Sequence, residues 1–421
     1  MTSNQNNEAF VWIWLPEETK PIVAGRLEAD KELIHFNYGK SYLERVADTS
    51  KVTSPIPIYE PELPLQSGRL PLPSGMTMHG CIRDAAPDAW GRRVIINRLS
   101  TGASIDSDNL SELTYLLNSG SDRIGSLDFQ RSPTHYEPRS VNNVSMEELI
   151  ESAERVENGV PLTLELDQAL FHGTSIGGAR PKALINDRGK KFIAKFSSSS
   201  DVYNVVKAEF IAMRLARLAG LDVADVKLTN VTSKDVLLIE RFDRQQSNGN
   251  WSRKSVVSAL TLLGLDDMMA RYASYETLAE IIRHRFTAPK DTLKELFSRL
   301  VFNILSGNTD DHARNHAAFW NGNSLTLTPA YDICPQGRTG NEASQAMLIT
   351  GNNNVSQLKT SAEAAKHFLL SAEDANTIFE KMIHKIEKHW DEVCDEAEVT
   401  TVDRSLFWQR QFLNPFSIIR S

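Results

Sequence analysis

The chain has 421 residues, of which 41% are hydrophobic and 24% charged, as expected for a globular protein of two or three domains. Its formal net charge is −8 and is spread without a long run of one sign, which argues against a protein that coats nucleic acid through a basic surface. The three widely spaced cysteines disfavour a disulfide framework or a cysteine-rich zinc site. The start lacks signal-peptide features and no apolar run approaches ~20 residues, so we expect a cytoplasmic protein.

The first part of the chain predicts a small β unit followed by helices. Aromatic and β-branched runs broken by Pro and Gly indicate antiparallel strands at residues 10–15, 22–29 and 33–38. The proline-rich stretch 55–73 predicts an irregular segment. Helices are predicted at 82–99, with Pro87 near its start, at 111–118, and from the capping box at Ser145 to about Val156. The polar stretch 130–143 marks a domain boundary.

A loop with paired glycines runs from Thr174 to Lys182 and is followed by a predicted β-hairpin. Paired glycines let backbone N–H groups approach an anion, and Arg180 and Lys182 add positive charge. The returning strand carries Lys195 in the run FIAKF, which is similar to the V-A-I-K strand of protein kinases. A lone Gly-Gly loop is more often a simple turn, so this pattern needs support from the rest of the chain.

The next elements have the composition of a helix, a strand and a connector. Residues 204–220 predict the clearest helix of the chain. Glu209 on this helix is a candidate partner for Lys195, in the manner of the kinase Lys–Glu pair, and a solvated surface charge is an equal alternative. The run 236–239 predicts a buried strand that leads into Glu240-Arg241-Phe242, whose backbone is suited to meet an adenine edge. After Gln245 the composition predicts helices to the end of the chain.

The segment from Ser306 to Asp332 concentrates acids and amides. Asp310 and Asn315 have the D-x-x-x-x-N spacing of a kinase catalytic loop, and Asp332 follows a short strand-like run at 324–328. Asp and Asn supply the hard oxygen ligands that magnesium prefers. An ordinary Asx-rich turn is the main alternative for the first half of this segment. His312 and His316, four residues apart, indicate metal-assisted hydrolysis as an alternative function, although the H-E-x-x-H form is absent.

Taken together, the order of these elements is that of a two-lobed protein kinase. The runs SIGGARPKALI, FIAKF, LLIERFDR, NILSGNTDDHARN and LTPAYDI resemble the HipA family of bacterial serine/threonine kinase toxins. The N-terminal β unit and the run IRDAAPDAWGRR resemble the extra N-terminal subdomain of that family. The predicted fold is therefore α+β and kinase-like, with a β-rich N-terminal subdomain at 1–140, an N-lobe at 141–245 and a mostly helical C-terminal lobe at 246–421.

The resemblance implies an ATP- and magnesium-dependent kinase of protein Ser or Thr, often of an aminoacyl-tRNA synthetase, restrained by a HipB-like DNA-binding antitoxin. It implies Asp310 as catalytic base, Asn315 and Asp332 as magnesium ligands, Lys195 on the nucleotide phosphates, supported by Glu209, and Ser175, beside Thr174, as the autophosphorylated residue. The remaining nucleotide-binding residues that it implies are Gly177, Gly178, Ala179, Arg180, Pro181, Lys182, Glu240, Arg241, Phe242 and His312.

Three points stay open at the level of sequence. Asp311 directly follows Asp310, so spacing alone assigns the base, and a structural role for His312 is an equal alternative. A small-molecule phosphotransferase would share the Asp, Asn and Asp layout, and label from ATP in protein bands would separate the two. A catalytically silent antitoxin-binding module would show no ATP-dependent melting shift.

Overall fold

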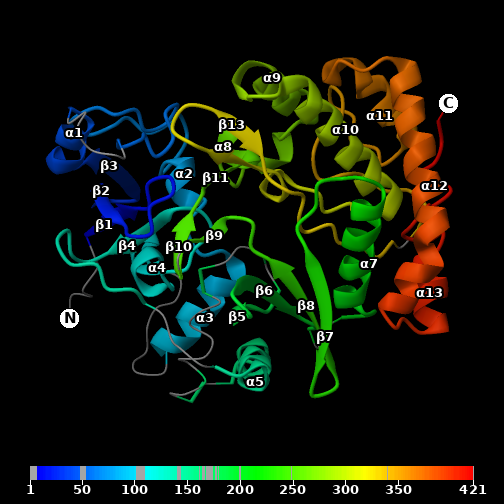
Figure 1. Cartoon of the computed structure of the whole chain (residues 1–421), viewed down its shortest axis with the longest axis horizontal. Coiled ribbons are helices and arrows are strands. Elements are labelled where there is room, and N and C mark those ends of the chain that lie inside the picture. The colour runs from blue at the N-terminus through cyan, green and yellow to red at the C-terminus, as the bar shows by residue number, and fades with distance from the viewer. Residues whose placement is uncertain are drawn as a thin grey trace.

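The structure, a computed structural model, describes residues 7–47, 54–100, 110–139, 144–160, 162–163, 166, 174–175, 178, 180–198, 201–247, 249–338 and 340–420. Its N-terminal part is built on an antiparallel sheet in the order β3-β2-β1-β4, seen at the left of Figure 1. The strands are β1 (Glu8–Ile13), β2 (Ile22–Asp30), β3 (Leu33–Tyr38) and β4 (Leu127–Gln130). The first three confirm the predicted β unit, and β4 returns from far along the chain to pair with β1.

Short helices accompany this sheet, and we call residues 8–139 the N-terminal module. They are α1 (Lys40–Ala47), α2 (Gly80–Arg83), α3 (Ala89–Ser100) and α4 (Glu112–Asn118), and α5 (Met146–Glu157) follows. The prediction of a single helix over 82–99 is wrong, because the chain breaks between α2 and α3. Pro87 explains the break, since proline disfavours a helical conformation in the residue before it. The predicted capping box of Ser145 with Glu148 is confirmed.

A second antiparallel sheet, in the order β5-β6-β8-β7, carries the predicted hairpin and strand lysine. Its strands are β5 (Lys182–Asp187), β6 (Lys190–Phe196), β7 (Val226–Val231) and β8 (Lys234–Glu240), and α7 (Val205–Leu218) packs against it. Side chains alternate across β8. Leu237 and Ile239 join the core that contains α7, whereas Val236 and Leu238 join a separate cluster with Trp90 and residues of α5. The sheet therefore has a hydrophobic layer on each face.

The region after Gln245 is only partly helical, so the prediction of helices from there to the end is wrong for its first part. Strands β9 (Arg244–Ser247) and β10 (Asn250–Arg253) form a hairpin. Strands β11 (Ser255–Ser258), β12 (Ala317–Trp320) and β13 (Leu325–Leu327) form another sheet in that order. These strands are short, and β11 pairs with β12 across a long stretch of sequence, from Ser255 opposite Trp320 to Ser258 opposite Ala317. Such pairing leaves little signal in a local window.

Helices make up most of the remaining C-terminal part. They are α8 (Ala259–Leu262), η3 (Ala270–Tyr272), α9 (Tyr275–Arg285), α10 (Pro289–Ser306), η4 (Ala313–Asn315), α11 (Leu358–Ala364), η5 (Ala365–Phe368), α12 (Ala372–Glu396) and α13 (Thr401–Phe407). The long helix α12 packs against both α7 and α10, at the right of Figure 1. Among the described residues, no helix has both the length and the apolar character of a membrane span.

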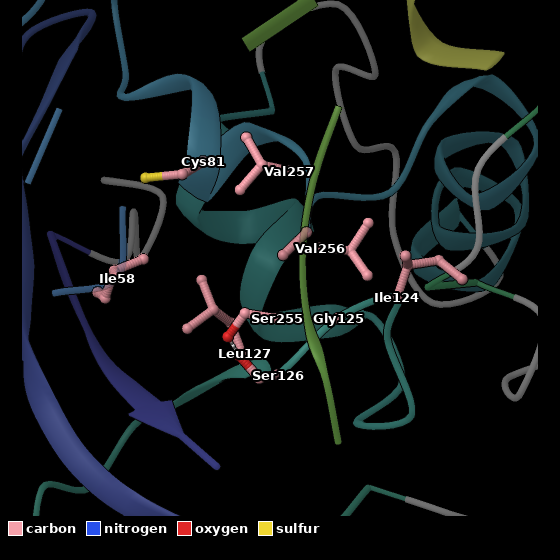
Figure 2. Close-up of a pocket in the computed structure, with 10 residues that line it drawn as sticks. Ile58, Cys81, Ile124, Gly125, Ser126, Leu127, Ser255, Val256 and Val257 are labelled. Carbon is pink, nitrogen blue, oxygen red and sulfur yellow. Dashed lines mark hydrogen bonds between the residues drawn. The ribbon is translucent and has the colours of Figure 1, made fainter. Parts of the chain in front are cut away.

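The N-terminal module packs directly on β11, and a small cavity lies in this interface (Figure 2). Its lining includes Ile58 and Cys81, residues Ile124 to Leu127, and Ser255 to Val257. The cavity volume of about 10 Å³ has room for roughly one water molecule. It is therefore a packing feature and is too small for a substrate.

Candidate active site

The acid- and amide-rich segment begins where α10 ends. Gly307 has φ 72°, and a Cβ on it would lie 2.6 Å from the carbonyl oxygen of Gln411, so glycine is required on both counts. The Asn308 N–H donates to the carbonyl of Asn303 at 2.9 Å, which secures the turn. The chain then passes through Asp310 and η4 into β12. Residues 308–316 are thus fixed at both ends by regular structure.

The two adjacent aspartates in this segment have different environments. Asp311 is 1% exposed, and its Oδ1 lies 3.0 Å from His316 Nε2, while the Tyr275 hydroxyl donates to its Oδ2. Tyr275 also contacts His316 Nε2 at 3.1 Å. Burial alone would raise the pKa of Asp311, but His316 and Tyr275 outweigh it and lower that pKa. Asp311 is therefore committed to an internal network.

Asp310, in contrast, is exposed to solvent. Desolvation by the surrounding atoms, together with the carboxylates of Asp332 and Asp311, raises the pKa of Asp310, with His312 opposing. A carboxylate with a raised pKa is a better proton acceptor at neutral pH. The geometry therefore favours Asp310 over Asp311 as the carboxylate that a substrate can reach.

Lys195 on β6 brings together carboxylates from two distant elements. Its Nζ donates to Glu209 Oε1 on α7 at 2.6 Å and also contacts Asp332 Oδ1. The predicted contact between Lys195 and Glu209 is present. Desolvation would lower the pKa of Lys195, but Asp332 and Glu209 outweigh it and raise that pKa, so the ammonium stays charged. Desolvation would likewise raise the pKa of Asp332, and Lys195 lowers it to about 2.

Asn315 and Asp332 belong to segments that are tied together. The side-chain Nδ2 of Asn315 donates to the carbonyl of Asp310 at 3.2 Å, and the Tyr331 hydroxyl donates to the carbonyl of Arg314 at 2.7 Å. Within the described parts of the chain, no three His, Cys, Asp or Glu side chains are arranged to hold a metal. Magnesium commonly takes one or two protein oxygens and completes its coordination with phosphate and water, so an amide and a carboxylate fit that ion.

The glycine-rich loop is held by the N-terminal module where the structure describes it. The Thr174 Oγ1 accepts a bond from the Gly120 N–H at 2.9 Å, and a Cβ at Gly91 on α3 would collide with the carbonyl of Thr174. Ser175 is 3% exposed, and its hydroxyl oxygen is buried without a hydrogen-bond partner. This segment therefore lies inside the molecule, against α3.

The second half of the loop carries two cationic side chains, those of Arg180 and Lys182. Gly178 has φ 109°, and a Cβ there would collide with the ammonium of Lys182. Burial lowers the pKa of Lys182 to about 8, with Asp88 opposing. Arg180 pairs with Asp201 at 2.7 and 2.9 Å, so its charge is already engaged. Pro181 lies beside β6, where its carbonyl accepts the Phe196 N–H at 3.1 Å. The predicted residues Gly177 and Ala179 lie outside the described residues.

The connector after β8 turns its charged side chains away from Lys195. Glu240 pairs with Lys190 at 2.5 Å, and Arg241 is buried among Asp122, Asp243 and the carbonyl of Arg123. The Glu240 and Arg241 N–H groups donate to the carbonyls of Asp225 and Lys191. A nucleotide contact by side-chain charge at either residue does not fit this geometry. The Phe242 ring packs at 5.8 Å from Phe319 and 5.6 Å from Tyr331, measured between ring centroids.

The two histidines of this segment have separate surroundings. His316 is 3% exposed and bound to Asp311 and Tyr275, whereas His312 lies beside Asp310 and has a buried Nδ1 without a partner. His312 and His316 flank the short η4 with extended backbone angles, so they do not share a helical face. This arrangement removes the premise of the metal-assisted hydrolase.

Sequence reasoning missed two residues next to the site. Tyr275 begins α9 and binds Asp311, and Asp88, just before α3, lies near Lys182 and Arg314 with a buried Oδ1 that has no partner. Neither residue has a local signal, because each meets the site through tertiary contacts.

Comparison with known proteins gives a consistent set of matches. The model of the HipA-like C-terminal domain family matches residues 174–390. The serine/threonine-protein kinase toxin HipA of Shewanella oneidensis is 26% identical over 186 residues, which cover 38% of this chain and 42% of that relative. A protein of Sinorhizobium fredii, provisionally named a kinase, is 28% identical over 131 residues, or 30% of this chain and 31% of that relative. The matches therefore span less than half of these relatives.

Similarity to a solved structure extends over nearly the whole chain. The structure of Shewanella oneidensis HipA, in a complex of HipA, HipB and operator DNA, matches with a TM-score of 0.68 at 20% identity. That match covers 94% of this chain and 97% of the other. It shows that the fold is the predicted α+β, two-lobed, kinase-like one.

Proposed function

This chain belongs to the HipA family, and on that premise we propose that it is a serine/threonine-protein kinase that uses ATP and magnesium. The observation that carries the proposal is the meeting of Lys195 from β6, Glu209 from α7 and Asp332 from the segment after β13. Phosphoryl transfer needs a positioned ammonium, oxygen ligands for metal and a carboxylate near the attacking hydroxyl. Asp310, exposed beside this cluster, supplies the last.

The proposed mechanism assigns a separate task to each side chain. Asp310 orients the attacking Ser or Thr hydroxyl and accepts its proton, which its raised pKa favours. Lys195, held by Glu209, contacts the nucleotide phosphates. Asn315 and Asp332 would hold magnesium, which would supply positive charge to offset that of the phosphates. The chemistry is then mostly positioning and electrostatic stabilisation.

The glycine-rich loop is assigned to the phosphates, with His312 beside the nucleotide. The Lys182 ammonium beside Gly178 and the partnerless His312 Nδ1 are the features that fit such a ligand. The connector Glu240–Phe242 would serve the adenine ring through backbone groups other than the Glu240 and Arg241 N–H groups, which already bond to the carbonyls of Asp225 and Lys191.

Ser175 is the proposed autophosphorylation site. Its hydroxyl is buried without a partner, whereas that of Thr174 accepts a bond from Gly120. A phosphate adds about −1.5 to −2 charge, which a site that is 3% exposed does not accommodate. Phosphorylation of Ser175 therefore requires the loop to leave its seat, and the modified loop would be less able to cover ATP.

The proposed partners follow from the family. The Shewanella oneidensis relative was solved with HipB and operator DNA, which supports a HipB-like DNA-binding antitoxin for this chain. With a net charge of −8, this chain is expected to reach DNA only through such a partner. We further propose a protein substrate, such as an aminoacyl-tRNA synthetase, and a cytoplasmic location.

The test compares the wild type with Asp310→Asn, using γ-labelled ATP, magnesium and a whole-cell lysate. We expect label in protein bands with the wild type and a loss of about 100- to 10,000-fold in the variant. The melting temperature of the variant should match that of the wild type, because the changed side chain is exposed. Full activity of the variant would reject the assignment of the base. Label found only in small molecules would show a small-molecule phosphotransferase instead of a protein kinase. The absence of an ATP-dependent shift in melting temperature would favour a catalytically silent module that binds an antitoxin.

A further inference from the structure

A turn of the N-terminal module reaches the connector after β8 through buried charges. This turn, Asp122–Gly125, lies opposite Arg241 and Arg244. Arg241 donates from Nη1 to the Asp122 carbonyl at 3.0 Å and from Nη2 to the Arg123 carbonyl at 2.6 Å. Arg244 donates from Nη1 to the Gly125 carbonyl at 3.0 Å. The carbonyls of the turn thus face the two guanidinium groups that flank Phe242.

Two carboxylates complete this set, which we call the connector cluster (Asp122, Arg241, Asp243 and Arg244). Asp122 Oδ1 accepts from Arg241 at 3.1 Å and from Arg244 at 2.8 and 3.0 Å. Asp243 Oδ2 accepts from both guanidinium groups at 2.8 Å and from the Gly125 N–H at 2.8 Å. The two arginine side chains are 0% and 1% exposed. Every bond in this set joins the turn to the connector or stiffens the connector itself.

The same turn also reaches the strand that carries Lys195. The Lys191 ammonium, on β6, contacts Asp122 Oδ2, and the Lys191 carbonyl accepts the Arg241 N–H at 2.8 Å. Asp122 is therefore shared between the strand of the phosphate-binding lysine and the connector. A rigid link of this kind fixes the distance between the two ends of a bound nucleotide.

We propose that the turn Asp122–Gly125 is a positioning element of the nucleotide site, with Asp122 holding the connector Glu240–Phe242 in place for the adenine ring of ATP. The inference rests on the proposed function and extends it, because it makes the N-terminal module part of the nucleotide site. Asp122 does not touch the ligand. It acts through Arg241, Arg244 and Lys191.

The charge of Asp122 explains how this turn can hold the connector in position. Removing the Asp122 carboxylate leaves two buried guanidinium groups and one ammonium with Asp243 alone, and an unpaired buried charge forces its surroundings to rearrange. The connector is the element that would move, because Arg241 belongs to it and Arg244 follows it two residues later. Loss of adenine positioning weakens substrate and transition-state binding equally, so it raises KM and leaves kcat unchanged.

The test measures KM for ATP, kcat and the Kd of a non-hydrolysable ATP analogue for the wild type, Asp122→Asn and Arg241→Lys. The lysine variant keeps the charge and loses the forked donor geometry, so it serves if Asp122→Asn folds poorly. Asp84→Asn is the matched control. Like Asp122, Asp84 is a half-buried carboxylate of the N-terminal module that crosses the same interface, but it binds the Ser258 N–H at 2.8 Å and hydroxyl at 2.7 Å rather than the connector.

We expect Asp122→Asn and Arg241→Lys to raise KM for ATP and the analogue Kd by about 10- to 100-fold. In Asp84→Asn both values should stay within about twofold of the wild type, with a comparable fall in melting temperature. Equal nucleotide affinities in the connector and control variants would overturn the positioning role while leaving kinase activity intact. A wild type that neither binds the analogue nor transfers label would instead reject the proposed function.

Discussion

Two buried groups of charges in this molecule differ in how their charge is balanced. The connector cluster sets two guanidinium groups and the Lys191 ammonium against Asp122 and Asp243, with carbonyls taking the remaining donors. We call Lys195, Glu209 and Asp332 the site cluster. Here one ammonium serves two carboxylates, and exposed Asp310 adds a third negative charge nearby. Carboxylates in excess at an exposed edge suit a cation, whereas a mostly buried set, in which three cations share two carboxylates and nearby carbonyls, suits a fixed position.

The largest effect is expected from Glu209→Gln in the site cluster. Gln is nearly the same size but offers no counter-charge, so Lys195 loses the partner that, in the proposed mechanism, holds it over the phosphates. We expect phosphoryl transfer to fall by about 100-fold, the scale of losing one preorganised electrostatic contact. The measurement is the initial rate of label transfer at saturating ATP.

Glu295→Gln is the control for this variant, because Glu295 pairs with buried Arg299 at 2.8 Å on α10 and is not part of the site cluster. Its activity should equal that of the wild type. If both glutamine variants retain full activity, the contact between Lys195 and Glu209 has no catalytic consequence.

Acid titration examines the connector cluster. Burial would raise the pKa of Asp243, but Arg241 and Arg244 outweigh it and lower that pKa to about 2. A carboxyl with a depressed folded-state pKa stabilises the fold above its unfolded pKa, and this stability is lost as pH falls through the folded value. From about pH 4 to pH 2 this group should therefore remove about 2 kcal/mol from the free energy of unfolding.

Urea unfolding at several pH values between 4 and 2 measures this loss. Asp243→Asn should be less stable than the wild type at pH 7 and should lose less stability over the acid range, since its side chain no longer titrates. Parallel stability curves for the two proteins would show that Asp243 has an ordinary pKa in the folded state.

The smallest effect is expected at the surface of the connector. Glu240 pairs with Lys190, a partly exposed ion pair, so Glu240→Gln should cost less than about 1 kcal/mol of stability. Because the Glu240 side chain points away from Lys195, KM for ATP should not change. A clear rise in KM would mean that the carboxylate contacts the nucleotide, contrary to the geometry. The melting temperature and KM of the purified variant decide this.

Local sequence patterns predicted the elements that carry the site. The D-x-x-x-x-N spacing, the strand around Lys195 and the helix at 204–220 all have strong local signals, and the contact of Lys195 with Glu209 followed from their order. The kinase-like α+β fold was also predictable, because the elements occur in a recognisable sequence. The roles of Asp310, Asn315 and Asp332 stay predictions.

Features set by distant contacts could not be predicted. Strand β11 is held in extended form by its pairing with β12, which is distant in sequence. The preceding hairpin, β9–β10, contains polar residues such as Gln245 and Gln246, which are not typical of strands. Asp311 and Tyr275 are 36 positions apart along the chain, and Asp122 and Arg241 are 119 apart. Periodicity carries no information about such pairs. The orientation of the Glu240 and Arg241 side chains likewise depends on partners outside the local window.

The contact between Lys195 and Asp332 also has a consequence for biosynthesis. The two residues are separated by 137 positions, so a ribosome translating at 5–20 residues per second needs roughly 7–27 s to add the second after the first. During that interval the nascent polypeptide presents the glycine-rich loop and its lysine without the opposing acid. Under the proposed function, the kinase therefore stays inactive until Asp332 has been translated, which gives a binding partner time to engage the nascent chain first.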